Sequence, residues 1–214
     1  MNTYTIQSVF RSLAGVSVSV LIREKSGEEE KAELLISDDL WHFRHLSAGD
    51  EIDSDTFAEM EHAALLSRAY ARTKEILSYS GHSKNGLIAK LRHHNLPEEI
   101  CKEAADWAIE KHLIREDEQA AMLADTYQRR KYWGRKRIYA ELSARGYTSE
   151  TVNEALKGIS AEDYLRALSI IIRNKYTPLP EDPAETQKMV LSLLRLGYTG
   201  QEIKDAIAQA EEEE

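Results

Sequence analysis

The sequence contains a single cysteine, Cys101, which excludes an internal disulfide and a metal site built from several thiolates. We expect this thiol to be a small buried apolar group rather than a reactive one. Proline is also scarce, with four residues, and this scarcity together with 30% charged residues favours folded helices over long disordered segments. The chain of 214 residues is 42% apolar, which is enough for a real core in one to four compact units.

Long hydrophobic runs are absent as well. No stretch of about 18 uncharged apolar residues occurs, which is the length that a membrane-spanning helix needs. The first ten residues lack the basic segment followed by an apolar segment that marks a signal peptide. The sequence therefore predicts no contact with a membrane and a cytoplasmic location.

Motifs for catalysis are missing from the chain. The phosphate-binding pattern Gly-x-x-x-x-Gly-Lys and the nucleophile pattern Gly-x-Ser-x-Gly both fail to occur, and no carboxylate pair differs from ordinary surface acids. Of the seven histidines, His93 and His94 are adjacent, so on one helix they would point about 100° apart and would not share one ion easily. We therefore expect no enzyme activity, no cofactor, no metal and no small-molecule substrate.

The net charge of −9 is unevenly distributed along the chain. Residues 1–58 carry a charge of −6, residues 59–116 are neutral, residues 117–158 carry +2, and residues 159–214 carry −5. For a partner that meets only one face, a basic middle between acidic ends matters more than the total. The middle of the chain is therefore the predicted contact for an anionic partner.

The first 57 residues are predicted to form a small β-rich extension. Valines alternate with serines over residues 16–20, a second short apolar run covers residues 32–36, and an acidic turn around Gly27 separates them, which is the pattern of a hairpin. Glu51 and Ile52 follow a turn and are predicted to form a further short strand. The segment from Asp38 to Leu46 is predicted to form one or two helical turns.

From Asp55 onward the apolar spacing is helical, with Ser54 or Asp55 as the predicted N-cap, and a motif then repeats with a shift of 51 residues. Residues 90–96 align with residues 141–147 and with residues 192–198. The aligned apolar sets are Leu87, Ile138 and Met189; Leu91, Leu142 and Leu193; and Leu96, Tyr147 and Tyr198. Asn95, Gly146 and Gly197 fall where a left-handed helix C-cap is expected. A second helix follows each turn, with Ile100, Val152 and Ile203 and then Ala104, Leu156 and Ile207 facing inward.

The predicted fold is mainly α: a tandem array of three three-helix repeats with a period of about 51 residues, preceded by the small N-terminal β extension. Longer helices over residues 58–79 and 117–131 open the first two copies. In the third copy, prolines between residues 176 and 183 end the corresponding first helix near Lys175. The predicted segments are 1–57 for the extension, 58–115 for repeat 1, 116–158 for repeat 2 with a basic turn, and 159–214 for repeat 3 with an acidic tail.

The sharpest local feature is the run Arg129-Arg130-Lys131-Tyr132-Trp133-Gly134-Arg135-Lys136-Arg137, with six cations in nine residues. Like charges this close repel one another, so an anionic partner is expected to offset the repulsion. Cations that neutralise phosphates, beside an aromatic ring that stacks on a base, are typical of proteins that bind single-stranded nucleic acid. Two alternatives stay open: Tyr132 and Trp133 pack between helices above a solvated basic face, or the cations meet an acidic protein surface.

Three ordered blocks together resemble the RecX family of recombination regulators. They are residues 107–117 (WAIEKHLIRED), residues 124–131 (ADTYQRRK), and residues 134–146 (GRKRIYAELSARG) followed by residues 152–156. In the family, an acidic turn leads into a helix, followed by a basic turn that contains glycine and by an Ile-x-x-x-Leu helix that ends in glycine. The resemblance covers residues 58–210, and the strand-like start resembles a small β extension of some members.

The resemblance implies a non-enzymatic regulator, expected as a monomer, that lies along the RecA filament on single-stranded DNA. Such a regulator inhibits the ATPase, recombinase and filament-extension activities of RecA, and so modulates recombination, DNA repair and the SOS response. The residues expected at the RecA and DNA contact are Arg129, Arg130, Lys131, Tyr132, Trp133, Arg135, Lys136 and Arg137, with Arg166, Arg173 and Lys175 as further candidates for the same surface. Two alternatives remain: a helical module that binds single-stranded nucleic acid without RecA, and a pure protein scaffold, for which charge reversal at residues 135–137 would leave partner binding intact.

Overall fold

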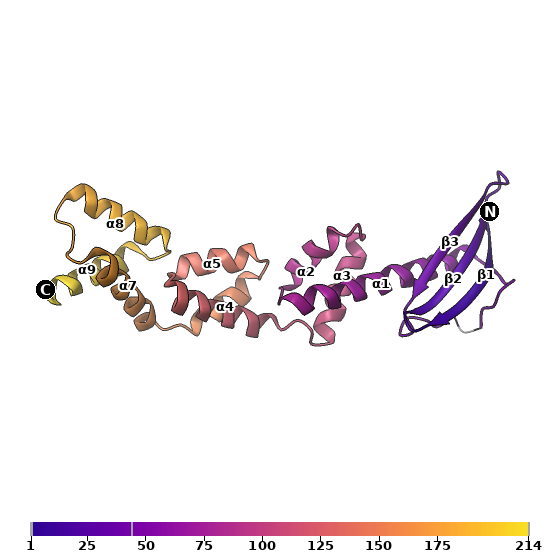
Figure 1. Ribbon diagram of the computed structural model, residues 1–214, viewed down its shortest axis with the longest axis horizontal. Helices are drawn as coiled ribbons and strands as arrows, with labels where there is room; N and C mark the ends of the chain where they lie inside the picture. Colours follow the sequence, from indigo (N-terminus) through magenta and orange to yellow (C-terminus); the bar gives the residue numbers. More distant parts are fainter. Residues whose placement is uncertain (1, 44, 214) are drawn as a thin grey trace. The chain divides into compact units, whose positions relative to one another are not determined.

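The computed structural model describes residues 2–43 and 45–213, with side chains up to residue 210 (Figure 1). The protein is mainly helical, with a four-stranded antiparallel sheet followed by nine helices in the described part of the chain. The chain forms two compact units. The first unit runs to Ser80 and includes Leu87–Lys111, and the second combines Gly81–Gly86 with the chain from His112 onward.

The sheet consists of β1 (Thr3–Ser12), β2 (Gly15–Arg23), β3 (Glu29–Ile36) and β4 (Glu51–Ile52), in the order β3-β2-β1-β4. The predicted hairpin corresponds to β2 and β3, and the predicted short strand is β4, which pairs with β1. Strand β1 has no counterpart in the prediction. Its sequence alternates only at Tyr4 and Ile6, because the pairing with β2 shifts register between Ile6 and Ser8, so β1 lacks the clear apolar alternation that marks a strand.

The predicted helical turns between Asp38 and Leu46 are partly right for the described residues of this segment. Leu40 N donates to Ser37 O and Trp41 N donates to Asp38 O, which makes one turn of consecutive bonds, but no regular helix follows and Leu46 N donates to Phe43 O in a separate turn. Trp41 and Phe43, two residues apart, are both buried in the core beneath the sheet. A spacing of two suits extended backbone rather than a helix, so burial of these two rings favours the irregular path. Arg44 lies outside the described residues.

Helix α1 (Ser54–Tyr79) begins one residue earlier than expected. The predicted N-cap at Ser54 or Asp55 is wrong, because the Asp53 carboxylate accepts a hydrogen bond from Thr56 N at 2.7 Å. That bond also lowers the pKa of the Asp53 carboxyl, since it favours the charged form. Phe57 and Met60 on α1 pack in one cluster with sheet residues that include Ile6. The sheet therefore shares its core with the first helix.

The remaining helices are α2 (Lys84–Arg92), α3 (Glu98–Glu110), α4 (Glu116–Lys131), α5 (Arg135–Ala144), α6 (Ser149–Lys157), α7 (Ala161–Tyr176), α8 (Pro183–Arg195) and α9 (Gly200–Glu213). The repeat is confirmed. All nine aligned apolar residues from Leu87 to Tyr198 are buried, and the three turn residues Asn95, Gly146 and Gly197 have φ values of 55°, 87° and 94°. Helix α7 ends at Tyr176, one residue after the predicted end.

Helices α4 to α9 surround one apolar core in the second unit. Its members include Ile138, Leu142, Tyr164 and Leu193, each at most 1% exposed. No helix in the described ranges has both the length and the apolar character needed to cross a bilayer. The predicted acidic tail, Glu211 to Glu214, lies outside the residues whose side chains are described. The division of the chain at residues 57, 115 and 158 stays a prediction.

Candidate nucleic-acid interface

The basic run surrounds the turn between α4 and α5. Three of its cations occupy the last turn of α4, where they interact favourably with the negative end of the helix dipole. The helix stops at Tyr132, whose φ and ψ of 52° and 39° are left-handed. Tyr132 N donates to Gln128 O at 3.0 Å, which is the single bond of the αL C-cap motif, and Trp133 N donates to Tyr127 O at 3.2 Å. A tyrosine therefore occupies a position that favours glycine, at a cost of about 1 kcal/mol.

The ring of Trp133 is half-buried and packs within the protein. It stacks on Tyr127 with a centroid separation of 4.8 Å, while Lys131 Nζ and the Arg137 guanidinium lie 4.5 and 4.2 Å from its centroid. Cation–π attraction of this kind offsets part of the repulsion between the neighbouring charges. Trp133 therefore organises the cations, and Tyr132, at 36% exposure, is the aromatic side chain of the run more open to a ligand.

Several cations of the run also make contacts that hold the fold together. Arg135 lies over the Tyr164 ring at 5.0 Å and donates a hydrogen bond to Leu156 O at 3.4 Å. Arg137 donates to Arg195 O at 3.4 Å, and Arg129 pairs with Asp125 at 2.7 Å.

The remaining two cations, Arg130 and Lys136, are exposed, and neither pairs with a carboxylate among the described residues. Their charges are therefore the most available to an anion.

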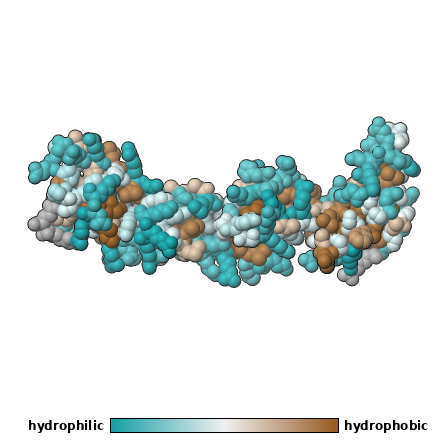
Figure 2. Space-filling model, viewed as in Figure 1, coloured by the Kyte–Doolittle hydropathy of each residue, from teal (hydrophilic) through white to brown (hydrophobic). Residues whose placement is uncertain are grey.

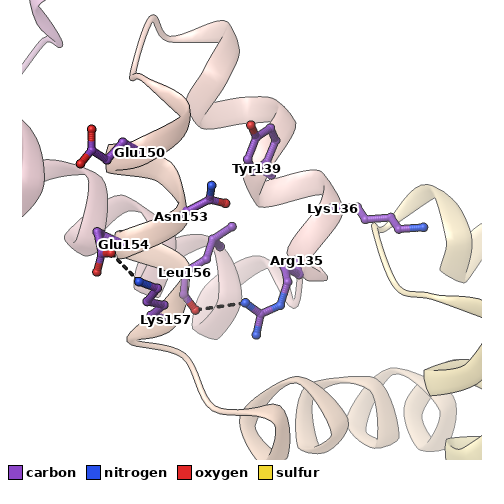
Figure 3. Close-up of a pocket in the computed structure, with 8 residues that line it drawn as sticks. All are labelled: Arg135, Lys136, Tyr139, Glu150, Asn153, Glu154, Leu156 and Lys157. Atoms are coloured by element: carbon purple, nitrogen blue, oxygen red, sulfur yellow. Dashed lines mark hydrogen bonds and ion pairs between the residues drawn. The ribbon is translucent and has the colours of Figure 1, made fainter.

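A hollow of about 820 Å³ lies beside the run, between α5 and α6 (Figure 3). It is lined by Arg135, Lys136, Tyr139, Glu150, Asn153, Glu154, Leu156 and Lys157. Its size lies within the range of small-ligand sites, and it offers cations, a phenol ring and an amide, which are groups that contact phosphates and bases. In Figure 3, Arg135 turns towards Leu156 while Lys136 extends away from the hollow, and Lys157 is paired with Glu154.

Sequence reasoning missed six of the eight residues that line this hollow, among them Tyr139, Asn153 and Lys157. The prediction was restricted to one contiguous run, whereas the hollow needs a second helix whose approach is set by tertiary packing. Tyr139 lies four residues after Arg135, so the helical spacing alone places both on one face of α5.

The three further candidates lie on α7. Arg166 pairs with Asp163 at 3.8 Å, and Lys175 Nζ lies 5.2 Å from the ring of its neighbour Tyr176. Arg166 and Arg173 are seven residues apart and share a helix face, whereas Lys175 is about 200° further round the helix from Arg173. The described contacts of Arg166 and Lys175 are both with residues of α7 itself.

The buried hydroxyl of Tyr164, beneath Arg135, makes the stability of the fold depend on pH. Burial raises the pKa of Tyr164 to about 12, although the Arg135 charge works in the opposite direction. Burial also raises the pKa of Tyr198. An unfolded phenol ionises near pH 10, so the unfolded chain loses these protons first. We expect the free energy of unfolding to be unaffected by Tyr164 below pH 10 and to fall by about 2 kcal/mol as the pH rises to 12.

The variant Tyr164→Phe tests this expectation. The Tyr164 hydroxyl is buried without a hydrogen-bond partner in the described part of the chain, so its removal is expected to leave the stability at pH 7 unchanged or up to about 1 kcal/mol higher. Urea unfolding at pH 7 and pH 11 is the measurement, and the variant should lose less stability at pH 11 than the wild type. Tyr79→Phe, at an 83% exposed ring, is the matched control. The expectation would be contradicted if the wild type, Tyr164→Phe and Tyr79→Phe all lost the same amount of stability between pH 7 and pH 11.

Several relatives of the chain carry the same name. Regulatory protein RecX of Salmonella paratyphi C is 31% identical over 150 residues, which span 64% of this chain and 90% of that protein. The chain belongs to the RecX family. Regulatory protein RecX of Bacillus velezensis is 22% identical over 200 residues, 91% of this chain and 73% of the relative. No protein-family model matches the chain.

Solved RecX structures share the fold. A crystal structure of regulatory protein RecX superposes with a TM-score of 0.73 at 18% identity, covering 94% of this chain and 99% of that one. RecX from Lactobacillus salivarius gives a TM-score of 0.61 at 22% identity over 68% of this chain and 96% of that one. The mainly helical architecture with an N-terminal sheet is therefore a RecX architecture. RecX proteins are named as regulators, and a regulatory role follows for this chain from its family.

Proposed function

We propose that the chain is a monomeric cytoplasmic regulator that binds the RecA filament on single-stranded DNA. In this proposal it inhibits the ATPase, recombinase and filament-extension activities of RecA and performs no catalysis of its own. The observation that supports it most is the basic run, in which exposed Arg130 and Lys136 flank an exposed aromatic, Tyr132, in a chain of the RecX family. Cations and one accessible ring suit a backbone of phosphates with unstacked bases.

The repeated units support binding to a filament rather than to a single protein. A filament presents the same surface at regular intervals, and the repeat presents related surfaces at intervals of 51 residues. Contacts that are individually weak gain avidity when they are linked in one chain. The proposal therefore needs no large apolar interface in any one repeat.

The test is the DNA-dependent ATPase rate of RecA that has been assembled on single-stranded DNA, titrated with the full chain. We expect the rate to fall at substoichiometric amounts of the chain, because a regulator that blocks filament extension affects many RecA subunits. Electron microscopy of the same samples should show shorter filaments. An unchanged ATPase rate at severalfold excess of the chain would overturn the proposal.

The alternative function is a helical module that binds single-stranded nucleic acid without RecA. The hollow beside Arg135 and Tyr139 favours it, because it could take a base and a phosphate directly. This alternative predicts binding to naked oligonucleotides that weakens steeply with salt, with a log–log slope of about −0.7 for each phosphate contact. Fluorescence anisotropy of a labelled poly-dT strand in the absence of RecA distinguishes the two functions.

Tyr132→Gly is expected to raise the stability of the protein and at the same time to weaken its inhibition of RecA. Glycine adopts the left-handed conformation freely, so the variant should gain roughly 0.5–1 kcal/mol of stability, or about 2 °C in Tm. The same change removes the exposed ring, and we expect inhibition of the RecA ATPase to weaken by about fivefold, within the range of 1–3 kcal/mol for one stacked base. Thermal melting and the ATPase titration measure the two effects. Equal inhibition by both proteins would show that Tyr132 does not contact the ligand.

A further inference from the structure

A groove of about 990 Å³ crosses the first unit, far in sequence from the basic run. Its walls come from β3, α1 and α3, and they include the apolar side chains of Leu34, Leu35 and Leu65. Figure 2 shows apolar residues at the surface over the sheet region. Leu35 is 49% exposed, and exposed apolar surface of this kind marks contact sites for partners.

One wall of the groove is an unpaired sheet edge. Strand β3 pairs with β2 along its whole length and has no strand on its other side. Within the described ranges, no backbone hydrogen bond other than those from β2 reaches residues 30–36. Ile36 is fully buried, but Ala32 and Leu34, on the same side of the strand, are only half-buried. Helix α1 therefore leaves part of this strand uncovered, and the edge is a template for another strand.

The opposite wall carries charge in a fixed order. Glu61 lies two turns of α1 before Arg68, and Lys74 lies nearly two turns after Arg68. Arg68 donates to Asn95 O at 3.4 Å, and Lys74 Nζ lies 5.6 Å from the Trp107 ring. In the described part of the chain, neither cation pairs with a carboxylate. The groove is therefore acidic at one end of α1 and basic at the other.

The floor between the two cations is aromatic and firmly held. Tyr70 of α1 and Trp107 of α3 stack with a centroid separation of 4.2 Å and an interplanar angle of 13°. Both rings line the groove. Stacked rings offer a flat apolar surface with little conformational freedom to lose, which lowers the entropic cost of binding an apolar side chain.

We propose that this groove binds an extended peptide of a partner protein, which adds to the edge of β3 and carries an acidic residue at the end that faces Arg68 and Lys74. A groove between an edge strand and a helix suits strand addition, in which main-chain hydrogen bonds give affinity and alternate side chains give specificity. The peptide places an apolar side chain on Tyr70 and Trp107. This surface is independent of the basic run, so the proposal does not rest on binding to RecA or DNA.

The experiment is a selection of a phage-displayed library of random dodecapeptides on the immobilised full chain, with the Ala71→Trp variant selected in parallel. Ala71 is exposed and lines the groove, so a tryptophan there fills the groove without disturbing the core. Ala58→Trp, at an exposed alanine of the same helix outside this groove, is the matched control. Selected peptides are then synthesised with a fluorescent label and measured by anisotropy.

We expect peptides enriched only on the wild type and on Ala58→Trp, with alternating apolar residues and an acidic end. Ala71→Trp should weaken their binding at least tenfold, and Lys74→Glu should weaken it about tenfold at low salt. Bound peptide should also slow hydrogen exchange of the β3 amides. The proposal would be overturned if no peptide were enriched on the wild type relative to Ala71→Trp. Peptides that bind Ala71→Trp and Lys74→Glu as tightly as the wild type would also overturn it.

Discussion

Gly197→Ala is expected to lower the Tm of the second unit by roughly 10 °C, the largest effect on stability that we predict for one substitution. The φ of Gly197 is 94°, and an added Cβ would lie 2.4 Å from Arg137 N and 2.6 Å from Arg137 Cβ. These atoms belong to the first turn of α5 and cannot move aside without shifting the helix. Left-handed strain together with overlap on backbone costs about 3–5 kcal/mol, which corresponds to this drop in Tm.

The partner glycine in this contact gives an independent check. Gly134→Ala would place a Cβ 2.5 Å from the carbonyl carbon of Gly197, and Gly134 N donates a hydrogen bond to Leu196 O at 2.7 Å. We expect a similar loss of stability. Gly158→Ala is the control, because Gly158 is right-handed and its nearest neighbour, Ala155 O, lies at an ordinary 3.5 Å. Differential scanning calorimetry measures the Tm of all three variants. Equal Tm values for Gly197→Ala and Gly158→Ala would contradict the predicted overlap at Gly197.

The same contact occurs again 51 residues earlier in the chain. Gly146 stands where Gly197 does, and Ser83 stands where Gly134 does. Ser83 Oγ donates to Arg145 O at 2.7 Å, whereas Gly134 uses its backbone N–H on the equivalent carbonyl. A Cβ on Gly146 would meet Ser83 Oγ at 2.9 Å. The repeat therefore includes the contact between a glycine turn and the start of a preceding helix, as well as the helices themselves.

Much of the helical architecture was predictable because it depends on local spacing. Apolar residues four apart, followed by Gly or Asn, specify a helix and its left-handed end, and Leu142 with Gly146 illustrates the rule. Tyr132 shows where the rule fails. It ends α4 in the left-handed region although tyrosine does not favour that region, because Trp133 stacks back on Tyr127 of α4 and the Tyr198 hydroxyl donates a hydrogen bond to Tyr132 O at 2.9 Å.

Features that depend on distant partners were not predictable from the sequence. Strand β1 pairs with β2 and β4, and these pairings compensate for its weak apolar pattern. Within the basic run, the sequence does not distinguish Arg135, which lies over the Tyr164 ring, from Lys136, which is exposed. Only tertiary packing separates the cations that hold the fold together from those available to a ligand.

The double variant Arg130→Glu, Lys136→Glu is expected to weaken inhibition of the RecA ATPase by about 30- to 100-fold at low salt. Both side chains are exposed and pair with no carboxylate in the described ranges, so reversing their charges leaves the described ion pairs in place. Each reversal replaces an attraction to phosphate with a repulsion, and about 1 kcal/mol or more for each residue gives this range. The concentration for half-maximal inhibition is the measurement. Thermal melting should show a Tm within about 2 °C of the wild type, because Arg130→Glu places a negative charge unfavourably at the end of α4 and Lys136→Glu places one favourably at the start of α5.

The matched control is Lys188→Glu, Lys204→Glu, at two exposed lysines of the same unit outside the basic run. Both double variants lower the net charge by the same amount, so a long-range effect of total charge would weaken inhibition equally in both. A contact with phosphates predicts weaker inhibition only in the first variant, and a log–log salt slope that is shallower by about 1.4 for two lost single-strand contacts. If instead inhibition weakened while the salt slope for single-stranded DNA binding stayed the same, Arg130 and Lys136 would contact an acidic surface of RecA rather than DNA.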